Sequence, residues 1–137
     1  MQTANAKGFD WPQDLIAEFN AAWGNGQVGH VLVSETEDVR VWQLRLAPGE
    51  RIGFHHHVLD YFWSAVTAGR SRSHMHDGSI VESDYAVGAT RHYRFGAGEY
   101  MIHDLENIGD TELVFVTVEH LAGSNKPHEL SSDVTRL

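Results

Sequence analysis

The stretch Gly49-Glu50-Arg51-Ile52-Gly53-Phe54-His55-His56-His57 places a glycine turn before three consecutive histidines in the middle of the chain. Side chains two positions apart share one face of a β-strand, so His55 and His57 point together and His56 points to the opposite face. The Cα atoms of such a pair lie about 6.5 to 7 Å apart, which lets two imidazoles converge on one metal ion. The stretch therefore predicts a strand that carries two candidate metal ligands.

A third ligand must come from another strand, and His103 is the best candidate. It ends a short apolar run over residues 100–103, just before an expected turn. The chain has 10 histidines in 137 residues, a high share for a residue that commonly serves proton transfer and metal binding. We therefore predict that His55, His57 and His103 bind one divalent metal ion and that His56 does not.

The hydrophobic pattern changes from helical to strand-like spacing at Gly24. Before it, apolar residues recur at helical spacing over residues 11–23, which predicts one short N-terminal helix. After it, apolar residues alternate with period two, and turn signals such as Asp77-Gly78 separate about eight or nine short strands. This pattern predicts an all-β fold, an antiparallel sandwich or barrel, behind the helix.

The chain length fits one domain. We expect a helical segment over residues 1–27, a β-barrel over residues 28–125 and a C-terminal tail over residues 126–137. The first ten residues lack the apolar core of a secretory signal, and no apolar run approaches the roughly 20 residues of a membrane helix. We therefore expect a cytoplasmic protein with no membrane partner.

The charge balance and the absence of cysteine exclude several classes of function. A net charge of -9 repels phosphates, which argues against nucleic acid and anionic membranes as partners. With no cysteine, the chain has no disulfide, no thiolate nucleophile and no zinc-finger or iron–sulfur ligands. A small molecule is the partner that remains.

The stretch around the histidine pair resembles the first motif of the cupin family. That motif is a glycine, five residues, His-x-His and, further on, a glutamate and a second glycine. Gly49, His55 and His57 match its spacing, and Gly69 closes it after the next expected strand. The glutamate falls at position 61 or 62, and Tyr61, which has the inward parity, replaces that carboxylate.

A second motif strengthens the resemblance. The second cupin motif ends in a histidine, three residues and an asparagine, which His103 and Asn107 match, although its earlier part is not kept. The resemblance covers roughly residues 39–121 and implies a small single-domain cupin of the conserved-barrel (cupin 2) type, an antiparallel jelly-roll barrel. Many cupins form homodimers, which implies a homodimer here, with a strand over residues 28–34 covering the partner's sheet edge.

The three histidines are similar to the metal ligands of three-histidine cupins, which include thiol and diketone dioxygenases that bind Fe(II). Three neutral imidazoles leave the full metal charge and open positions for water, substrate or dioxygen. Fe(II) is favoured, Zn, Ni or Cu also suit imidazole, and Mn is kept as a further candidate. We expect a metal-dependent, dioxygenase-like enzyme, or an isomerase or lyase, acting on a small organic acid, thiol or carbonyl compound. The alternatives are a non-catalytic ligand-binding or sensing cupin and a metal-free sugar-type isomerase with a His–Tyr acid–base pair.

Five further side chains are open to two interpretations each. Tyr61 is the candidate catalytic residue, as a hydrogen-bond donor or in proton transfer, or else it packs in the barrel. His74 and His76 either line the mouth of the pocket or are exposed in a hairpin. His92 either points into the barrel or lies on the surface. Glu119 is either a carboxylate at the barrel mouth or a solvated side chain.

Overall fold

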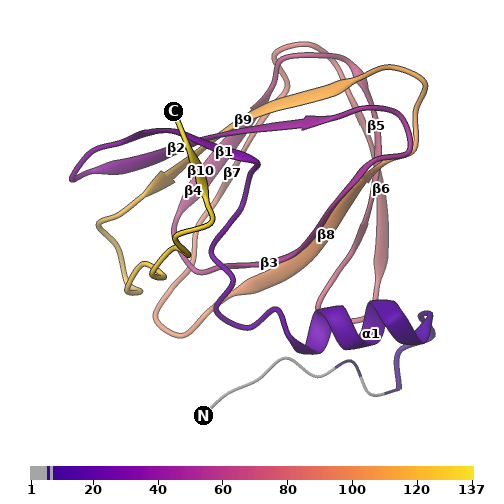
Figure 1. Cartoon of the computed structure of the whole chain (residues 1–137), viewed down its shortest axis with the longest axis horizontal. Helices are drawn as coiled ribbons and strands as arrows, with labels where there is room; N and C mark the ends of the chain where they lie inside the picture. Colours follow the sequence, from indigo (N-terminus) through magenta and orange to yellow (C-terminus); the bar gives the residue numbers. More distant parts are fainter. Residues whose placement is uncertain (1–5, 7) are drawn as a thin grey trace.

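Two sheets form the body of the molecule in the computed structural model, which describes residue 6 and residues 8–137 (Figure 1). Residues 1–5 and 7 of the expected segment over residues 1–27 lie outside the described residues. The six-stranded sheet has the order β10-β1-β2-β9-β4-β7, and the four-stranded sheet has the order β3-β8-β5-β6. The strands are β1 (Val31–Glu35), β2 (Val39–Leu46), β3 (Arg51–His57), β4 (Tyr61–Ala65), β5 (Gly69–His74), β6 (Ile80–Tyr85), β7 (Thr90–Tyr93), β8 (Met101–Asn107), β9 (Leu113–His120) and β10 (Thr135–Arg136).

All strand pairings but one among the described residues are antiparallel, which confirms the predicted antiparallel barrel. The exception is the short parallel contact of β10 with β1. The longest pairing joins β2 to β9, from Val39 opposite His120 to Leu46 opposite Leu113, and β9 also pairs with β4. Alternation along β2 and β9 directs side chains such as Leu44 and Phe115 into the space between the sheets, where they form part of the apolar core.

One helix, α1 (Gln13–Asn20), packs beside the four-stranded sheet (Figure 1). It is shorter at both ends than the predicted residues 11–23, because Pro12 is extended (φ -55, ψ 148) and the chain leaves the helix at Ala21. Its buried Phe19 packs with Trp11 against Phe54 of β3. Among the described residues, no helix has the length and hydropathy that crossing a bilayer requires.

Strand β8 continues well beyond the turn expected after His103, so that expectation was wrong. His103 lies near the middle of β8, and the turn comes after Asn107. The strand continues through polar Asp104 because this fully buried carboxylate is neutralised and hydrogen-bonded on the outer face of the sheet. Asn107 then ends the strand: its amide donates to the carbonyls of Leu46 and Thr111.

The two glycines of the first motif are required by local geometry. Gly49 has a φ of +84, a conformation that side-chain-bearing residues rarely adopt. A Cβ on Gly69 would lie 2.6 Å from Cδ2 of Leu113, closer than two carbon atoms can approach. The motif therefore marks a tight turn before β3 and a close contact at the start of β5.

Candidate metal centre

The structure brings His55, His57 and His103 together at one wall of an internal cavity. His55 and His57 lie two positions apart on β3, and His103 lies opposite His55 on β8. One ring nitrogen from each lies within 4.8 Å of the others, and the ring centroids are 4.7 to 5.1 Å apart. The cavity has a volume of about 390 Å³, and all three imidazoles line it.

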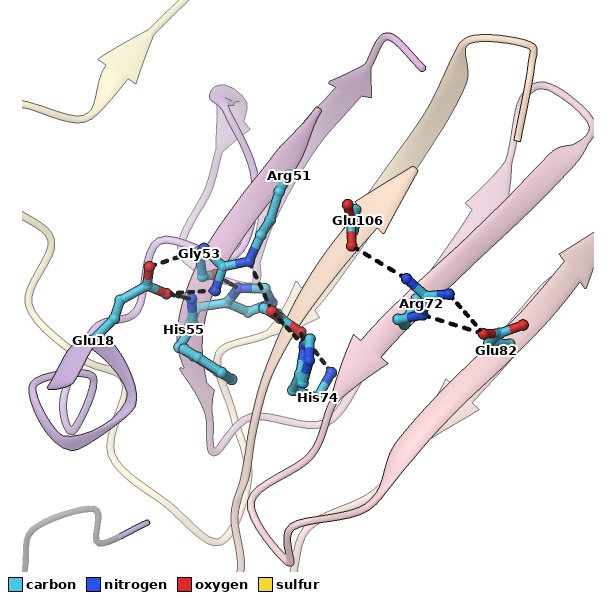
Figure 2. Close-up of polar contacts among 10 residues, drawn as sticks. Glu18, Arg51, Gly53, His55, Arg72, His74, Glu82 and Glu106 are labelled. Carbon is cyan, nitrogen blue, oxygen red and sulfur yellow. Dashed lines mark hydrogen bonds and ion pairs between the residues drawn. The ribbon is translucent and has the colours of Figure 1, made fainter. Parts of the chain in front are cut away.

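A bulge in β3 orients the first of these histidines. The register of β3 against β8 shifts between Ile52 and His55, which frees the Gly53 carbonyl from regular pairing. Nδ1 of His55 lies 2.8 Å from this carbonyl oxygen, and because a carbonyl can only accept, Nδ1 carries the proton (Figure 2). The lone pair of Nε2 is therefore free for a ligand, an arrangement typical of metal-binding histidines.

The other two histidines have the spacing of two ligands to one ion. Their Nε2 atoms are 3.2 Å apart. Two nitrogens bonded at about 2.1 Å to one metal ion lie about 3.0 to 3.4 Å apart for angles between 90° and tetrahedral. Nδ1 of His57 is buried with no hydrogen-bond partner among the described residues, so no hydrogen bond to this nitrogen compensates for its burial. The His57 and His103 nitrogens therefore fit a single divalent ion, and the His55 nitrogen lies within 4.8 Å of both.

Burial keeps all three imidazoles neutral. Loss of solvation lowers the pKa of His55 to about 4, although the bond to Gly53 opposes the shift. The same desolvation holds the pKa of His57 and that of His103 well below the ordinary value, and the neighbouring imidazoles lower them further. Neutral imidazole is the form that ligates a metal, so the site is ready to bind at neutral pH without releasing protons.

Tyr61 occupies the place where the motif has its glutamate, and it lies flat against a candidate ligand. Its ring stacks on His57 with centroids 4.2 Å apart and on Tyr93 with centroids 4.7 Å apart. Its side chain is buried and lines the cavity, and burial raises the pKa of Tyr61 well above its usual value. Tyr61 is therefore a neutral phenol that can donate a hydrogen bond into the cavity.

His56 points away from the cavity. Its Nδ1 accepts a hydrogen bond of 2.9 Å from the backbone N–H of Gly24, and its ring packs between Trp23 and His128. The alternation predicted for the three consecutive histidines is thus observed. His56 helps to fix the segment between α1 and β1 to the outer face of β3.

His74, His76 and His92 lie outside the cavity, and each is held there by a different contact. His74 is held on the outer face of the four-stranded sheet by Asp104, whose Oδ2 accepts from Nδ1 at 3.0 Å, so it is neither at a pocket mouth nor an exposed hairpin residue. His76 accepts at 3.3 Å from a backbone N–H of β8. His92 is exposed and packs on Phe62, its partner on β4, so it does not point into the barrel.

Glu119 fits neither of the two interpretations drawn from its sequence context. It is 3 % exposed, and its Oε1 accepts a hydrogen bond of 2.8 Å from Nε1 of Trp42. Burial raises the pKa of Glu119 to about 7, while the bond from Trp42 opposes the shift. This carboxyl lies across from Tyr61 in the sheet, but it does not line the cavity.

The sequence reasoning missed the wall of the cavity contributed by β7. Arg91 and Tyr93 line it, because they flank the outward-facing His92 in the alternation of this strand. Pairing with β4 fixes that parity: Tyr93 lies opposite Tyr61, and Arg91 lies opposite Trp63. Because Tyr61 was expected to point inward, its pairing partner Tyr93 and, two residues away, Arg91 could have been expected to point inward as well.

A polar network lies on the outer face of the four-stranded sheet, next to the strand that carries His55 (Figure 2). Arg51 donates from Nε to Asp104 at 2.8 Å and from both terminal nitrogens to Glu18 of α1. Glu18 also accepts from the backbone N–H of Phe54, inside the bulge that orients His55. The arginine lowers the pKa of Glu18 through its hydrogen bonds. The helix is thereby fixed to the strand that carries two of the histidines.

The chain is similar in structure to several solved proteins that share one fold. A cupin domain from Bordetella pertussis is 31% identical, with a TM-score of 0.57, and the match covers 65% of this chain and 88% of that one. A protein with a double-stranded β-helix domain from Klebsiella pneumoniae is 22% identical (TM-score 0.53, covering 68% and 76%). A cupin-family protein from Methanocaldococcus jannaschii is 20% identical (TM-score 0.52, covering 69% and 75%), and these two show the fold alone. No protein-family model matches the chain, and no curated protein matches it.

Proposed function

Because the chain belongs to the cupin family, as a small single-domain member, we propose that His55, His57 and His103 hold one divalent transition-metal ion in its barrel. The observation that carries the proposal is the convergence of three ring nitrogens within 4.8 Å on one wall of the cavity. The neutral state of the three rings supports it, because neutral imidazole is the ligating form. Fe(II) is the favoured ion, Zn, Ni and Cu suit the same donors, and Mn is a further candidate.

The proposed activity is that of a metal-dependent enzyme acting on a small organic acid, thiol or carbonyl compound, with oxygenation as the leading reaction. An ion held by three imidazoles supplies a Lewis acid with open positions for substrate and dioxygen. The chain contributes a cavity of about 390 Å³, which is large enough to enclose a small molecule. The phenol of Tyr61, neutral and next to His57, is proposed to donate a hydrogen bond to the bound substrate.

Metal analysis followed by activity screening tests this function. Protein purified without chelator is expected to contain close to one transition-metal ion per chain, measured by inductively coupled plasma mass spectrometry. Protein loaded with Fe(II) is then screened for oxygen uptake with small acids, thiols and diketones. A wild-type protein that retains no metal after loading with Fe(II), Mn(II), Ni(II) or Zn(II) would contradict the proposal.

The second candidate is a metal-free isomerase. The contact of Tyr61 with His57 favours it, since the two side chains could form an acid–base pair in the same cavity. The 3.2 Å separation of the His57 and His103 nitrogens also suits a direct hydrogen bond without any ion. Retention of activity after exhaustive chelation would favour this candidate. A metal-loaded protein that binds ligands without turnover would instead indicate a binding or sensing role.

A homodimer remains part of the proposal, although the strand expected to cover the partner's sheet edge is not free to do so. The strand expected over residues 28–34 is β1 in the structure, and β2 and β10 of the same chain pair with it on both sides. Sedimentation at micromolar concentration is expected to give twice the 15.3 kDa chain mass.

A further inference from the structure

The exposed part of the cavity lining lies on the edge strands of the two sheets. Strand β6 ends the four-stranded sheet and β7 ends the six-stranded one, and side chains of both line the cavity. Val81 of β6 and Arg91 of β7 line it and are also exposed to solvent. A molecule entering from this side therefore meets Arg91 before it reaches the three histidines.

Arg91 is the one charged side chain among the residues that line this cavity. Its other walls are aromatic or aliphatic, with hydroxyls from Ser73, Ser83 and Thr117, and the three histidines are neutral. Among the described residues, no carboxylate lies within ion-pair distance of Arg91. Five other arginines each pair with at least one Asp or Glu: Arg40, Arg45, Arg51, Arg70 and Arg72. In a chain of net charge -9, this cation is left available to a ligand.

A column of rings holds Arg91 in position. Its guanidinium carbon lies 5.1 Å from the ring centroid of Tyr93, a cation–π distance. Tyr93 stacks on Tyr61 at 4.7 Å, and Tyr61 stacks on His57 at 4.2 Å. The guanidinium is thus linked to a candidate metal ligand by three consecutive contacts. Stacking orders the arginine while leaving its N–H groups free, which suits bidentate recognition of a carboxylate.

We infer that Arg91 binds the carboxylate of a small monoanionic organic acid whose apolar body fills the cavity. This inference deepens the proposed function. Only the role given to the histidines, at the far end of the ligand, rests on that proposed function. The aromatic wall formed by Trp63, Tyr85 and Phe115 selects an apolar body. In the chelator-treated protein no second cation lines the cavity, so a dianion would there bury one carboxylate without a partner and bind less tightly than a monoanion.

Binding of matched acids and amides tests the inference. The probes are hexanoate and 3-phenylpropanoate with their uncharged amides, titrated by isothermal calorimetry into zinc-loaded and chelator-treated protein. In Arg91→Gln, a side chain that cannot form the charge-assisted pair, we expect binding of the acids to weaken about 10- to 100-fold and binding of the amides to stay the same. Arg94→Gln is the matched control, because it removes the same charge next to β7 from a side chain that does not line the cavity.

Each outcome separates this inference from the metal proposal. Weakening of acid binding in Arg91→Gln but not in Arg94→Gln, in both the zinc-loaded and the chelated protein, supports the role of Arg91 whether or not the metal proposal holds. Acid binding that disappears on chelation and is unchanged in Arg91→Gln overturns it and leaves the metal proposal standing. Amides that bind wild type as tightly as the acids, or acids that show no binding at millimolar concentration, also overturn it.

Discussion

The two faces of β3 use alternate residues of one histidine run for opposite purposes. On the inner face, His55 and His57 face a cavity and make few hydrogen bonds with the rest of the protein. On the outer face, His56 and Arg51 are bound to other segments of the chain. A run of identical residues on a strand can therefore serve two purposes, because the period of two places neighbouring side chains in different environments.

Histidine-to-alanine changes at adjacent positions give the largest contrast between the two faces. His57→Ala removes one of three ligands and is expected to lose most of the bound metal, measured as metal per chain after loading and desalting. His56→Ala should keep the metal, because its ring lies on the opposite face. That variant should instead lose about 1 to 3 kcal/mol of stability, since the Gly24 N–H loses its acceptor. Equal metal loss in both variants would refute the assignment of the faces.

The ion pair of Arg51 with Asp104 on the outer face should contribute more to stability than an exposed ion pair does. Arg51→Met leaves fully buried Asp104 without its cation, and we expect the free energy of unfolding to fall by about 3 to 5 kcal/mol. Urea unfolding of chelated protein at pH 7 measures the change. Arg45→Met is the control, because its pair with Glu112 is about half exposed and should contribute less than about 1 kcal/mol. Similar losses in the two variants would show that Asp104 does not need Arg51.

Buried Glu119, on the inner side of the barrel, should make the folding stability of the protein depend on pH. Its pKa is raised from 4.5 to about 7, so between these pH values the folded state binds the proton and the unfolded state does not. Stability therefore falls as pH rises through this window, by up to about 3 kcal/mol from this group. Glu119→Gln keeps an acceptor for Trp42 and should be more stable than wild type at pH 8.5 and similar at pH 4.5. Parallel stability curves for the two proteins would contradict this.

The smallest structural effect is expected for Tyr61→Phe. Phenylalanine keeps the stacking on His57 and Tyr93, so metal content should be unchanged and stability should change by less than about 1 kcal/mol. If the phenol donates to the substrate, turnover should fall about 10- to 100-fold in the oxygen-uptake assay. An unchanged rate would reduce Tyr61 to a packing residue.

The sequence predicted the parts of the site that depend on local alternation. The parity of His55 and His57 follows from the period of two alone. The inward direction of Tyr61 came from extending the same alternation past residues 58–60, which lie between the two strands. The bulge at Gly53 and the network around Asp104 could not be predicted, because they depend on α1 meeting β3 across 33 positions of the chain. The end of β8 was misplaced for the same reason: a buried aspartate resembles a turn residue until its partners from other strands are known.

The central position of β9 has a consequence for how the protein is made. This strand lies between β2 and β4 and pairs with both, yet it follows them in the chain by about 50 to 80 residues. During synthesis the six-stranded sheet cannot assemble until residue 120 has left the ribosome, and the earlier strands remain exposed until then. Such long-range pairing also makes folding slow. Ribosome-bound chains that stop before β9 should therefore be sensitive to protease, whereas chains that include it should be protected.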